Sequence, residues 1–247
     1  MAALVSSSER RLARVANGAP RVPWADFKRD VFRWEHGEHV AMIGPTGQGK
    51  TTLMRSILPL HPYTVVMATK PRDKSMTALE RSGFVIIDRW RSIDPRDMPR
   101  RILWPDASRL DSEREQAEVF KDAFAKIYRE GAWTIAIDEL WYMHNVLKLG
   151  PPIRTYMLQS RALDISVVNS TQRPAWVPTE VYDQSTHLFF WRNNDARAQR
   201  RLGEINMIDS ELVRDTIGSL ERHQFLYIDA RTGQMVRSRC PQLTEGR

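Results

Sequence analysis

A complete phosphate-binding loop limits the folds open to this chain of 247 residues: Gly44-Pro45-Thr46-Gly47-Gln48-Gly49-Lys50-Thr51. These residues match the Walker A pattern G-x-x-x-x-G-K-[ST]. Residues 38–43 before the loop form a short β-rich run, and residues 52–58 after it predict a helix that ends at Pro59. Because strand, loop and helix occur in the order that nucleotide binding requires, we predict a P-loop fold.

Each part of the loop has a physical role in holding phosphate. The glycines let the backbone curl so that its N–H groups point at phosphate oxygens, and the helix opening at Gly49 adds its positive dipole end. Lys50 is expected to reach the β and γ phosphates, and the Thr51 hydroxyl to bind Mg²⁺. We therefore expect ATP and Mg²⁺ as ligands, with the nucleotide held by Gly44, Pro45, Thr46, Gly47, Gln48, Gly49, Lys50, Thr51 and Thr52.

A second chemical signal is an apolar strand that ends in two carboxylates, residues 133–137 followed by Asp138 and Glu139. In a P-loop enzyme the first acid at this strand end holds Mg²⁺ and the second polarises the attacking water. We assign Asp138, with Thr51, to Mg²⁺. Glu139 is the candidate general base, and Lys50 is counted with it among the catalytic residues. A glutamate at this position favours a hydrolysing ATPase over a nucleotide kinase.

Residues 165–174 predict another strand with a polar end, and Gln172 stands near its tip. An amide at the tip of the strand beside Asp138 can lie near the γ-phosphate or its attacking water. Gln172 is therefore a further candidate catalytic residue, and Thr171 is a candidate to share its role. The alternative is that Gln172 only forms a hydrogen bond at the end of the strand.

Strand and helix predictions alternate along the chain, which indicates a mainly parallel sheet covered on both sides. The predicted class is α/β: a P-loop NTPase three-layer sandwich of the RecA/ASCE-like type with a C-terminal β-hairpin. We expect a flexible basic arm over residues 1–23, the ATPase core over 24–205, and a helix and hairpin over 206–247 that complete the sheet. The other strand candidates are residues 63–69, 83–88, 101–104 and 188–192, and a hairpin signal joins residues 223–229 to 234–237.

Local signals place several helix ends. Ser112 and Glu115 have the spacing of a capping box, and their helix is expected to end at Gly131. A later helix is expected to take Gly218 as its C-cap. Apolar residues at helix-like spacing predict helix within residues 24–36.

The formal charge of +7 favours a polyanionic partner, since clustered Lys and Arg gain affinity by releasing phosphate counterions. The arginines gather in residues 10–21, 89–101 and 192–201. Each cluster is either a nucleic acid contact or a solvated face. The long arginine-rich stretch of residues 89–101 is the first candidate for a surface that grips DNA.

Other features exclude whole classes of protein. No run approaches the roughly 18 uninterrupted apolar residues of a membrane span, so no membrane partner is expected. The lone Cys240 excludes an intrachain disulfide and a cysteine metal cluster and fits a reducing compartment. We therefore expect a cytoplasmic protein, in the host cytoplasm if a phage encodes it, and give Cys240 no role.

Several of these features together resemble the FtsK/HerA superfamily of DNA-pumping ATPases. They are the loop at residues 44–51, the strand end at Asp138 and Glu139, and the pairing of Ser160-Arg161-Ala162 with a strand that closes in Ser-Thr-Gln-Arg-Pro at residues 170–174. The similarity covers residues 38–205. The chain resembles the compact DNA-packaging ATPases of phages and mobile elements more than the large chromosome translocases.

The resemblance implies a homo-oligomeric ring of five or six subunits, with double-stranded DNA through the centre and ATP between neighbours. It also implies an arginine from the adjacent subunit that stabilises charge on the transferred phosphoryl group. Arg161 is the first candidate for this arginine finger, and Arg154 and Arg173 are the alternatives. A salt bridge on a helix face is the other interpretation of Arg161.

The predicted function is therefore an ATP-hydrolysing motor that translocates double-stranded DNA through phosphate contacts with weak sequence preference. Its task would be viral or prophage genome packaging, or DNA transfer, together with portal, capsid or transfer proteins. Two alternatives stay open: an AAA-like ATPase that remodels protein partners or loads them on DNA, and a nucleotide-dependent assembly switch.

Overall fold

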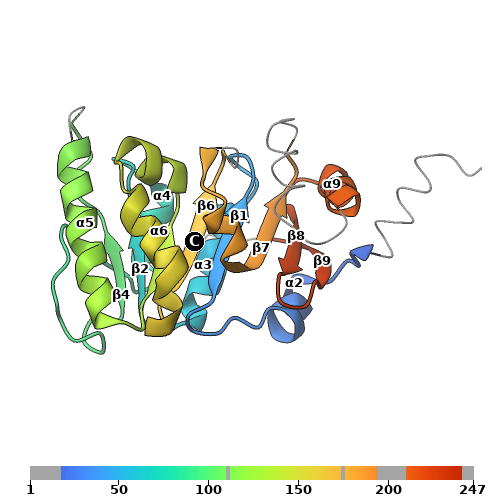
Figure 1. Cartoon of the computed structure of the whole chain (residues 1–247), viewed down its shortest axis with the longest axis horizontal. Coiled ribbons are helices and arrows are strands. Elements are labelled where there is room, and N and C mark those ends of the chain that lie inside the picture. Colours follow the sequence, from blue (N-terminus) through green and yellow to red (C-terminus); the bar gives the residue numbers. More distant parts are fainter. Residues whose placement is uncertain (1–17, 110–111, 174–175, 194–209, 241–247) are drawn as a thin grey trace, which may run out of the picture.

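Nine strands form one sheet in the part of the chain that the computed structural model describes, residues 18–109, 112–173, 176–193 and 210–240 (Figure 1). Their order across the sheet is β3-β4-β2-β5-β6-β1-β7-β8-β9. All pairs from β3 to β7 are parallel, whereas β7–β8 and β8–β9 are antiparallel. The strands are β1 (His39–Ile43), β2 (Thr64–Met67), β3 (Val85–Ile87), β4 (Arg100–Leu103), β5 (Thr134–Ile137), β6 (Ser166–Thr171), β7 (Ser185–Trp191), β8 (Gln224–Asp229) and β9 (Met235–Arg239). The predicted mainly parallel α/β sheet with a C-terminal hairpin is confirmed.

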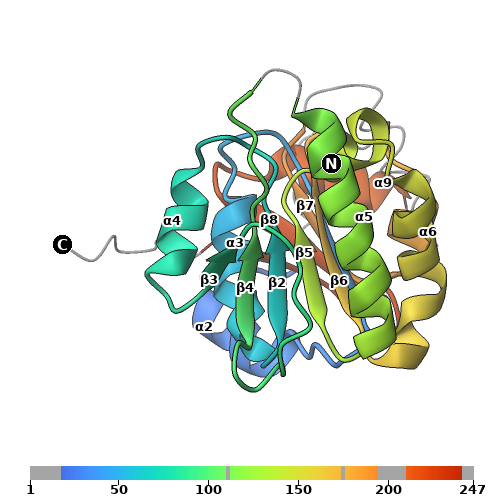
Figure 2. The ribbon, with the colours of Figure 1, turned by 90° about the vertical axis from the view of Figure 1, so that its left-hand side faces the viewer.

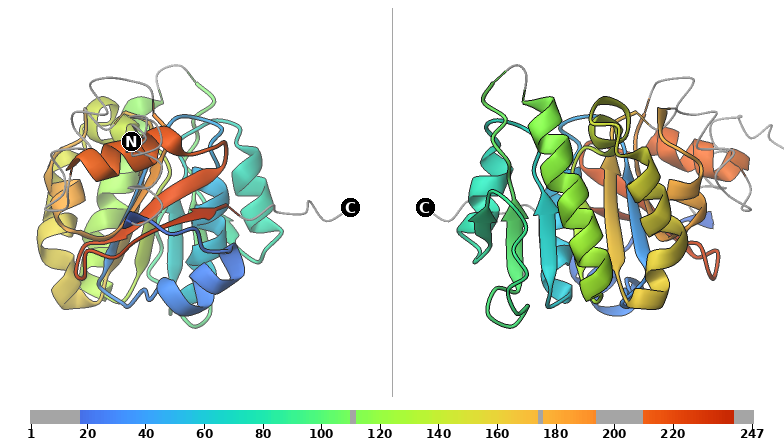
Figure 3. Two further views of the ribbon diagram at one scale, coloured as in Figure 1. Left: turned by 90° about the vertical axis from the view of Figure 1, so that its right-hand side faces the viewer. Right: turned by 60° about the vertical axis from the view of Figure 1, so that its left-hand side comes forward.

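Helices lie on both sides of the sheet, as Figures 2 and 3 show. One side carries α3 (Lys50–Ile57) and α4 (Lys74–Glu80), and the other carries α5 (Glu113–Glu130), α6 (Gly150–Gln159) and α9 (Ser210–Ser219). The shorter elements are α2 (Trp24–Asp26), η1 (Phe27–Val31), η2 (Leu58–Leu60), η3 (Tyr142–Val146), η4 (Ser160–Leu163) and α7 (Glu180–Asp183). This is the predicted three-layer arrangement. None of the described helices is both long enough and apolar enough to cross a membrane.

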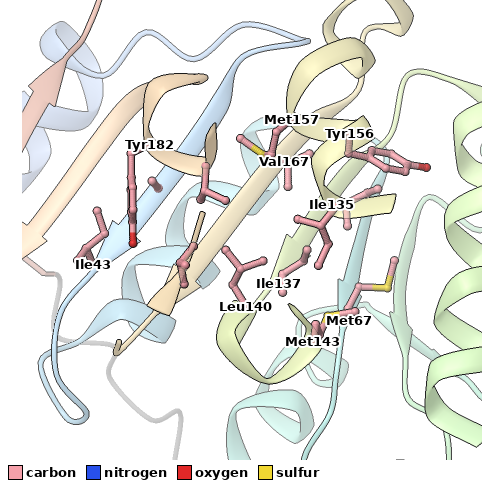
Figure 4. Packing of buried hydrophobic residues seen from close by; sticks show 14 of the residues in the cluster. Ile43, Met67, Ile135, Ile137, Leu140, Met143, Tyr156, Met157, Val167 and Tyr182 are labelled. Carbon is pink, nitrogen blue, oxygen red and sulfur yellow. The ribbon is translucent and has the colours of Figure 1, made fainter. Parts of the chain in front are cut away.

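Alternation along the buried strands divides the core into two clusters, one on each face of the sheet. In β1, Ala41 and Ile43 belong to the cluster under α5 and α6, whereas Val40 and Met42 belong to the cluster under α3 and α4. Because both faces are covered, β1, β5 and β6 are buried at every position, as parallel strands usually are. Figure 4 shows part of the first cluster, in which Val167 and Ile135 of the strands lie near Met157 and Tyr156 of α6, whereas Ile43 lies on the side of Tyr182.

The long helix α5 follows directly from its apolar spacing. Phe120, Phe124 and Ile127 recur at helical intervals and are all buried against the sheet. The helix ends where predicted, because Gly131 adopts a φ of 71°, a left-handed conformation that glycine reaches without a Cβ clash.

Two local predictions are wrong, and a third is confirmed in part. Ser112 adopts helical dihedrals and does not cap α5, because its hydroxyl accepts a hydrogen bond from Gln116 Nε2 at 3.0 Å instead. Gly218 lies inside α9 rather than beyond it. The helix predicted within residues 24–36 is present as α2 and η1 over residues 24–31, but it ends at Val31 because Phe32 is already extended.

The described part of the predicted basic arm, residues 18–23, packs along β9. Val22 N donates to the carbonyl oxygen of Arg237 at 2.8 Å, Arg237 N donates to Pro20 O at 2.8 Å, and Ala19 is fully buried. Residues 1–17, like the predicted boundary at residue 205, lie outside the described residues. The domain boundaries therefore stay predictions.

Arg101, predicted to help grip DNA, is a core residue instead. Its side chain is fully buried at the start of β4, where the guanidinium lies 4.4 Å from the ring centroid of Trp90 and 4.6 Å from that of Trp133. It also donates to three backbone carbonyl oxygens, those of Met98 (2.9 Å), Arg91 (3.0 Å) and Ile93 (2.9 Å). A side chain so enclosed holds the loop between β3 and β4 in shape and is not available to DNA.

The remaining arginines of this stretch are partly neutralised by neighbouring acids. Arg96 Nη2 lies 2.7 Å from Asp94 Oδ2, and Arg89 Nε lies 3.4 Å from Asp88 Oδ2. Both arginines are exposed. The stretch therefore presents alternating charge rather than a continuous basic surface, while Arg197, Arg200 and Arg201 of the later cluster lie outside the described residues.

Candidate nucleotide-binding site

The phosphate-binding loop turns from the end of β1 into the first turn of α3, as the sequence predicted. Gly47 and Gly49 adopt φ values of 75° and 100°, which side chains rarely allow. Gly44 is needed for a different reason, since a Cβ there would lie 2.6 Å from the Cβ of Trp191. Lys50 is the first residue of α3, so the free N–H groups of this helix end open toward the loop.

The Lys50 side chain folds back onto its own loop. Its ammonium donates to Gly44 O at 2.6 Å and to Pro45 O at 2.9 Å. Burial lowers the pKa of Lys50 to about 8, although the charges of Asp138 and Glu139 act in the opposite direction. A cation that is desolvated and bonded only to neutral carbonyls gains strongly from a phosphate anion.

Thr51 and Asp138 meet in front of α3. Thr51 Oγ1 donates to Asp138 Oδ1 at 3.0 Å. The other carboxylate oxygen accepts from Lys70 Nζ at 3.2 Å, and Lys70 also lies 3.8 Å from Asp73 Oδ2. The sequence analysis did not identify Lys70 as a site residue, although it predicted a strand over residues 63–69 that ends just before Lys70. Pairing of β2 with β5 places Lys70 next to Asp138.

The donor set at this point suits Mg²⁺. Thr51 and Asp138 offer hydroxyl and carboxylate oxygens, the ligand types that Mg²⁺ prefers, and these sites usually include phosphate oxygens and water as well. The Lys70 ammonium on Asp138 indicates that the carboxylate accepts a cation here. The residues present therefore fit the metal that the sequence led us to expect.

Glu139 is half-buried beside the charged groups of the site. Burial raises the pKa of Glu139, and the negative charge of Asp138 raises it further, against the opposing charges of Lys50, Lys70 and Arg173. A carboxylate with a raised pKa accepts a proton from water more readily than an exposed one.

Gln172 follows β6, the strand between the one that ends before Asp138 and the one that leads into the loop. Strand β6 lies between β1 and β5, so its end opens at the same edge of the sheet as the loop. Gln172 Oε1 accepts a hydrogen bond from Thr46 Oγ1 at 2.5 Å. Thr171 is buried; its hydroxyl accepts from Arg173 N at 3.1 Å, and its carbonyl oxygen accepts from Gly44 N of the loop at 3.2 Å.

These side chains surround a hollow of about 260 Å³. It is lined by the loop and first turn of α3 (Thr46, Gly47 and residues 49–52), by Asp138 and Gln172, and by Lys70 and His223. Of the other predicted loop residues, Gln48 accepts a 3.5 Å hydrogen bond from His223 N. Like Lys70, His223 was not singled out from the sequence, because it is brought to the site by the hairpin more than 170 residues along the chain.

The three candidate arginine fingers occupy different places. Arg161 is exposed at the edge of the sheet opposite the loop, where it donates to Thr186 Oγ1 at 2.9 Å and to Gly37 O at 3.4 Å. Arg154 pairs with Glu180 at 3.2 Å on the surface of α6. Arg173 follows β6 at the edge of the sheet that carries the phosphate-binding loop, which we call the nucleotide edge. Its guanidinium lies 4.5 Å from the ring centroid of Trp141.

A scan of protein-family models and a search of curated proteins found no match for this sequence. Comparison with solved structures found similar folds. The DNA-packaging ATPase B204 from Sulfolobus turreted icosahedral virus has a TM-score of 0.63 at 17% identity, with 85% of this chain and 100% of that chain covered. The genome-packaging NTPase B204 from Sulfolobus turreted icosahedral virus 2, in complex with ATPγS, has a TM-score of 0.61 at 16% identity, with coverages of 85% and 100%.

A third similar structure is VirB4 of Thermoanaerobacter pseudethanolicus, with a TM-score of 0.63, 11% identity and coverages of 83% and 90%. Nearly the whole length of each of these proteins is matched, so the likeness concerns complete folds and not a shared fragment. The resemblance expected from the sequence is thus confirmed at the level of architecture. This chain has the α/β fold of the P-loop packaging ATPases, with an intact phosphate-binding loop at the edge of its sheet.

Proposed function

We propose that this protein is an ATPase that uses hydrolysis to translocate double-stranded DNA, most simply in packaging a viral or prophage genome or in DNA transfer. The observation that carries the proposal is the meeting of Lys50, Asp138 and Gln172 around one hollow at the end of three adjacent strands, with Glu139 next in the chain and within range of the Lys50 and Asp138 charges. The similarity of fold to proteins named as DNA-packaging ATPases supports the DNA motor among ATPase functions.

The side chains divide the work of hydrolysis. Lys50 leaves its carbonyl partners to neutralise charge on the β and γ phosphates. Glu139 orients water and takes its proton, helped by its raised pKa. Gln172, whose Oε1 accepts a hydrogen bond from Thr46, is expected to respond to the terminal phosphate. Mg²⁺, held by Thr51 and Asp138, would neutralise charge that develops on the phosphate oxygens.

A ring assembled head to tail explains where the arginine finger comes from. In such a ring, the face that meets the neighbour's nucleotide differs from the face that holds the subunit's own. Arg161 is exposed and lies at the edge opposite its own loop, so it meets this requirement better than Arg173, which lies beside its own Glu139. Arg154, also exposed, is the second choice. We propose a ring of five or six subunits, acting in the cytoplasm with portal, capsid or transfer proteins.

The experiment that tests the proposal is Mg²⁺-dependent ATP hydrolysis with and without long duplex DNA. It uses the unchanged protein, Glu139→Gln, Arg161→Ala and mixtures of the two variants. We expect DNA to stimulate hydrolysis, each variant to lose it, and mixing to restore part of it, because a mixed interface can pair an intact Glu139 with an intact Arg161. Loss of an arginine finger supplied by a neighbouring subunit typically lowers the rate of hydrolysis by about 10³ to 10⁵.

Other results would point elsewhere. Hydrolysis that is indifferent to DNA would replace the translocase with an ATPase that remodels protein partners. Nucleotide binding without hydrolysis under any condition would leave an assembly switch. If mixing the two variants restores nothing while Glu139→Gln alone is inactive, the finger is not Arg161, and the same mixtures made with Arg154→Ala are the next test.

A further inference from the structure

The C-terminal hairpin contributes directly to the phosphate-binding loop. Residue Cys240, after β9, donates from its thiol to Gly49 O at 3.4 Å, and its backbone N–H donates to His223 O at 2.9 Å. A Cβ placed on Gly49 would lie 3.0 Å from Cys240 Sγ and 3.6 Å from His223 Nδ1. The His223 ring therefore lies beside Gly49, where the loop enters α3.

His223 has features of a ligand contact rather than of a packing residue. It adopts a φ of 65°, in the left-handed region that residues other than glycine seldom occupy. Such conformations persist where the surroundings impose them, and they concentrate at binding sites. The side chain is only partly buried and lines the hollow, and its ring nitrogens make no hydrogen bond with any residue that the structure describes.

The sheet order fixes which end of a nucleotide would meet His223. Along the nucleotide edge, Asp138 follows β5, Gln172 follows β6 and the loop follows β1, whereas His223 precedes β8 on the far side of the loop. Metal and water chemistry at Asp138 and Gln172 places the γ-phosphate on their side. A nucleotide is a chain from γ-phosphate to base, so its nucleoside end extends away from Asp138, toward His223.

We propose that His223 forms the nucleoside subsite, with its imidazole packed against the ribose and base of the bound nucleotide. The inference rests on the proposed nucleotide binding and adds a second recognition element to it. The phosphate-binding loop recognises phosphate, and the C-terminal hairpin recognises the nucleoside. Bound nucleotide would therefore contact both α3 and the hairpin, which already meet at Gly49, Cys240 and His223.

Equilibrium binding of two probes to the full chain tests this subsite in the absence of DNA. The probes are ATP, which has a nucleoside, and inorganic tripolyphosphate, which has only the phosphates. The variant is His223→Asn, because asparagine tolerates a left-handed backbone and the fold is kept. The matched control is His36→Asn, at an exposed histidine that stacks on His61 near the opposite edge of the sheet.

We expect His223→Asn to weaken ATP binding about five- to a hundredfold, the range measured when a stacking ring is removed from a base. Tripolyphosphate binding should change less than about twofold, and His36→Asn should leave both probes unaffected. Equal weakening of both probes would overturn the inference, because His223 would then act only by shaping the loop through Gln48. Unchanged binding of both probes would overturn it too. Failure of the unchanged protein to bind either probe would instead refute nucleotide binding itself.

Discussion

The nucleotide edge of the sheet and the opposite edge both bury charged side chains, but they satisfy them differently. At the nucleotide edge, burial lowers the pKa of Lys50 to about 8 and raises that of Glu139. Both shifts favour the neutral forms, so these groups are held at a cost in stability that a charged ligand can recover. Buried charge without full pairing supports the proposal that hydrolysis takes place at this edge.

At the opposite edge, Glu38 at the foot of β1 is fully paired. Burial alone would raise the pKa of Glu38, but hydrogen bonds from His187 Nε2 and Glu35 N, with the charge of Arg231, more than offset this, so that its pKa lies below the usual value. His187 also shares a 2.8 Å hydrogen bond with the Tyr227 hydroxyl. These contacts join β1 to the hairpin, which makes them structural.

The contrast between the two edges is tested most directly by removing one buried cation from each, beginning with Lys50. We expect Lys50→Ala to lower ATP hydrolysis by about 10² to 10³, the usual cost of losing a preorganised charge at a reacting group. Its free energy of unfolding should change by less than about 1 kcal/mol, because the ammonium is desolvated and bonded only to loop carbonyls. Hydrolysis assays and urea unfolding measure both, with exposed Lys28→Ala as the control. Retention of hydrolysis within tenfold would contradict the role of Lys50.

Arg101 gives the converse result. Arg101→Ala should lower the free energy of unfolding by about 3 kcal/mol or more, since it empties a site between two tryptophans and leaves three carbonyl oxygens without donors. Arg100→Ala, one residue away and less buried, should change it by less than about 0.5 kcal/mol. Urea unfolding of the two variants compares them directly. Similar losses in both would show that the buried arginine is not special.

The opposite edge should also set the acid limit of stability. Burial lowers the pKa of His61 to about 4, against about 6.5 in an unfolded chain. Between those two pH values the His61 imidazole is protonated in the unfolded chain but neutral in the folded chain. This contribution to stability is complete above about pH 6.5 and falls by up to about 3 kcal/mol as the pH drops to about 4. In His61→Gln this part of the fall should vanish, and an unchanged pH profile of unfolding would refute the assignment.

Replacement of Lys70 should give the smallest effect, and it tests what the cation beside Asp138 does at the nucleotide edge. If Asp138 binds Mg²⁺ as proposed, the Lys70 ammonium competes with the metal, so Lys70→Met should lower the Mg²⁺ concentration that half-saturates ATP binding by about two- to fivefold. Because Lys70 is 48% exposed, its removal should barely change stability. Fluorescent nucleotide binding across a Mg²⁺ titration measures this, with Lys74→Met as the exposed control. An unchanged or higher Mg²⁺ requirement would mean that Lys70 helps to hold nucleotide instead.

The sequence was sufficient for features that depend on neighbours along the chain. Gly47 and Gly49 predict the loop because a left-handed backbone favours glycine, and the apolar run before Asp138 predicts a buried strand. The spacing of Phe120 and Ile127 likewise predicts one face of α5. Each of these signals lies within a few residues of the structure that it predicts.

The sequence was insufficient where a role depends on strand order. Arg101 looks like any arginine of a basic loop until Trp90 and Trp133 enclose it. Lys70 reaches Asp138 only because β2 pairs with β5, and His223 reaches Gly49 only because the hairpin pairs with β7.

The loop, the two carboxylates and the strand and helix spacing are local features of the sequence, and they specify the P-loop architecture. Which buried charges have a partner of opposite charge, and which distant residues line the hollow, depends on the tertiary structure. The physical reason is that desolvation and pairing of charge depend on through-space neighbours, and those are set by sheet order and not by distance along the chain.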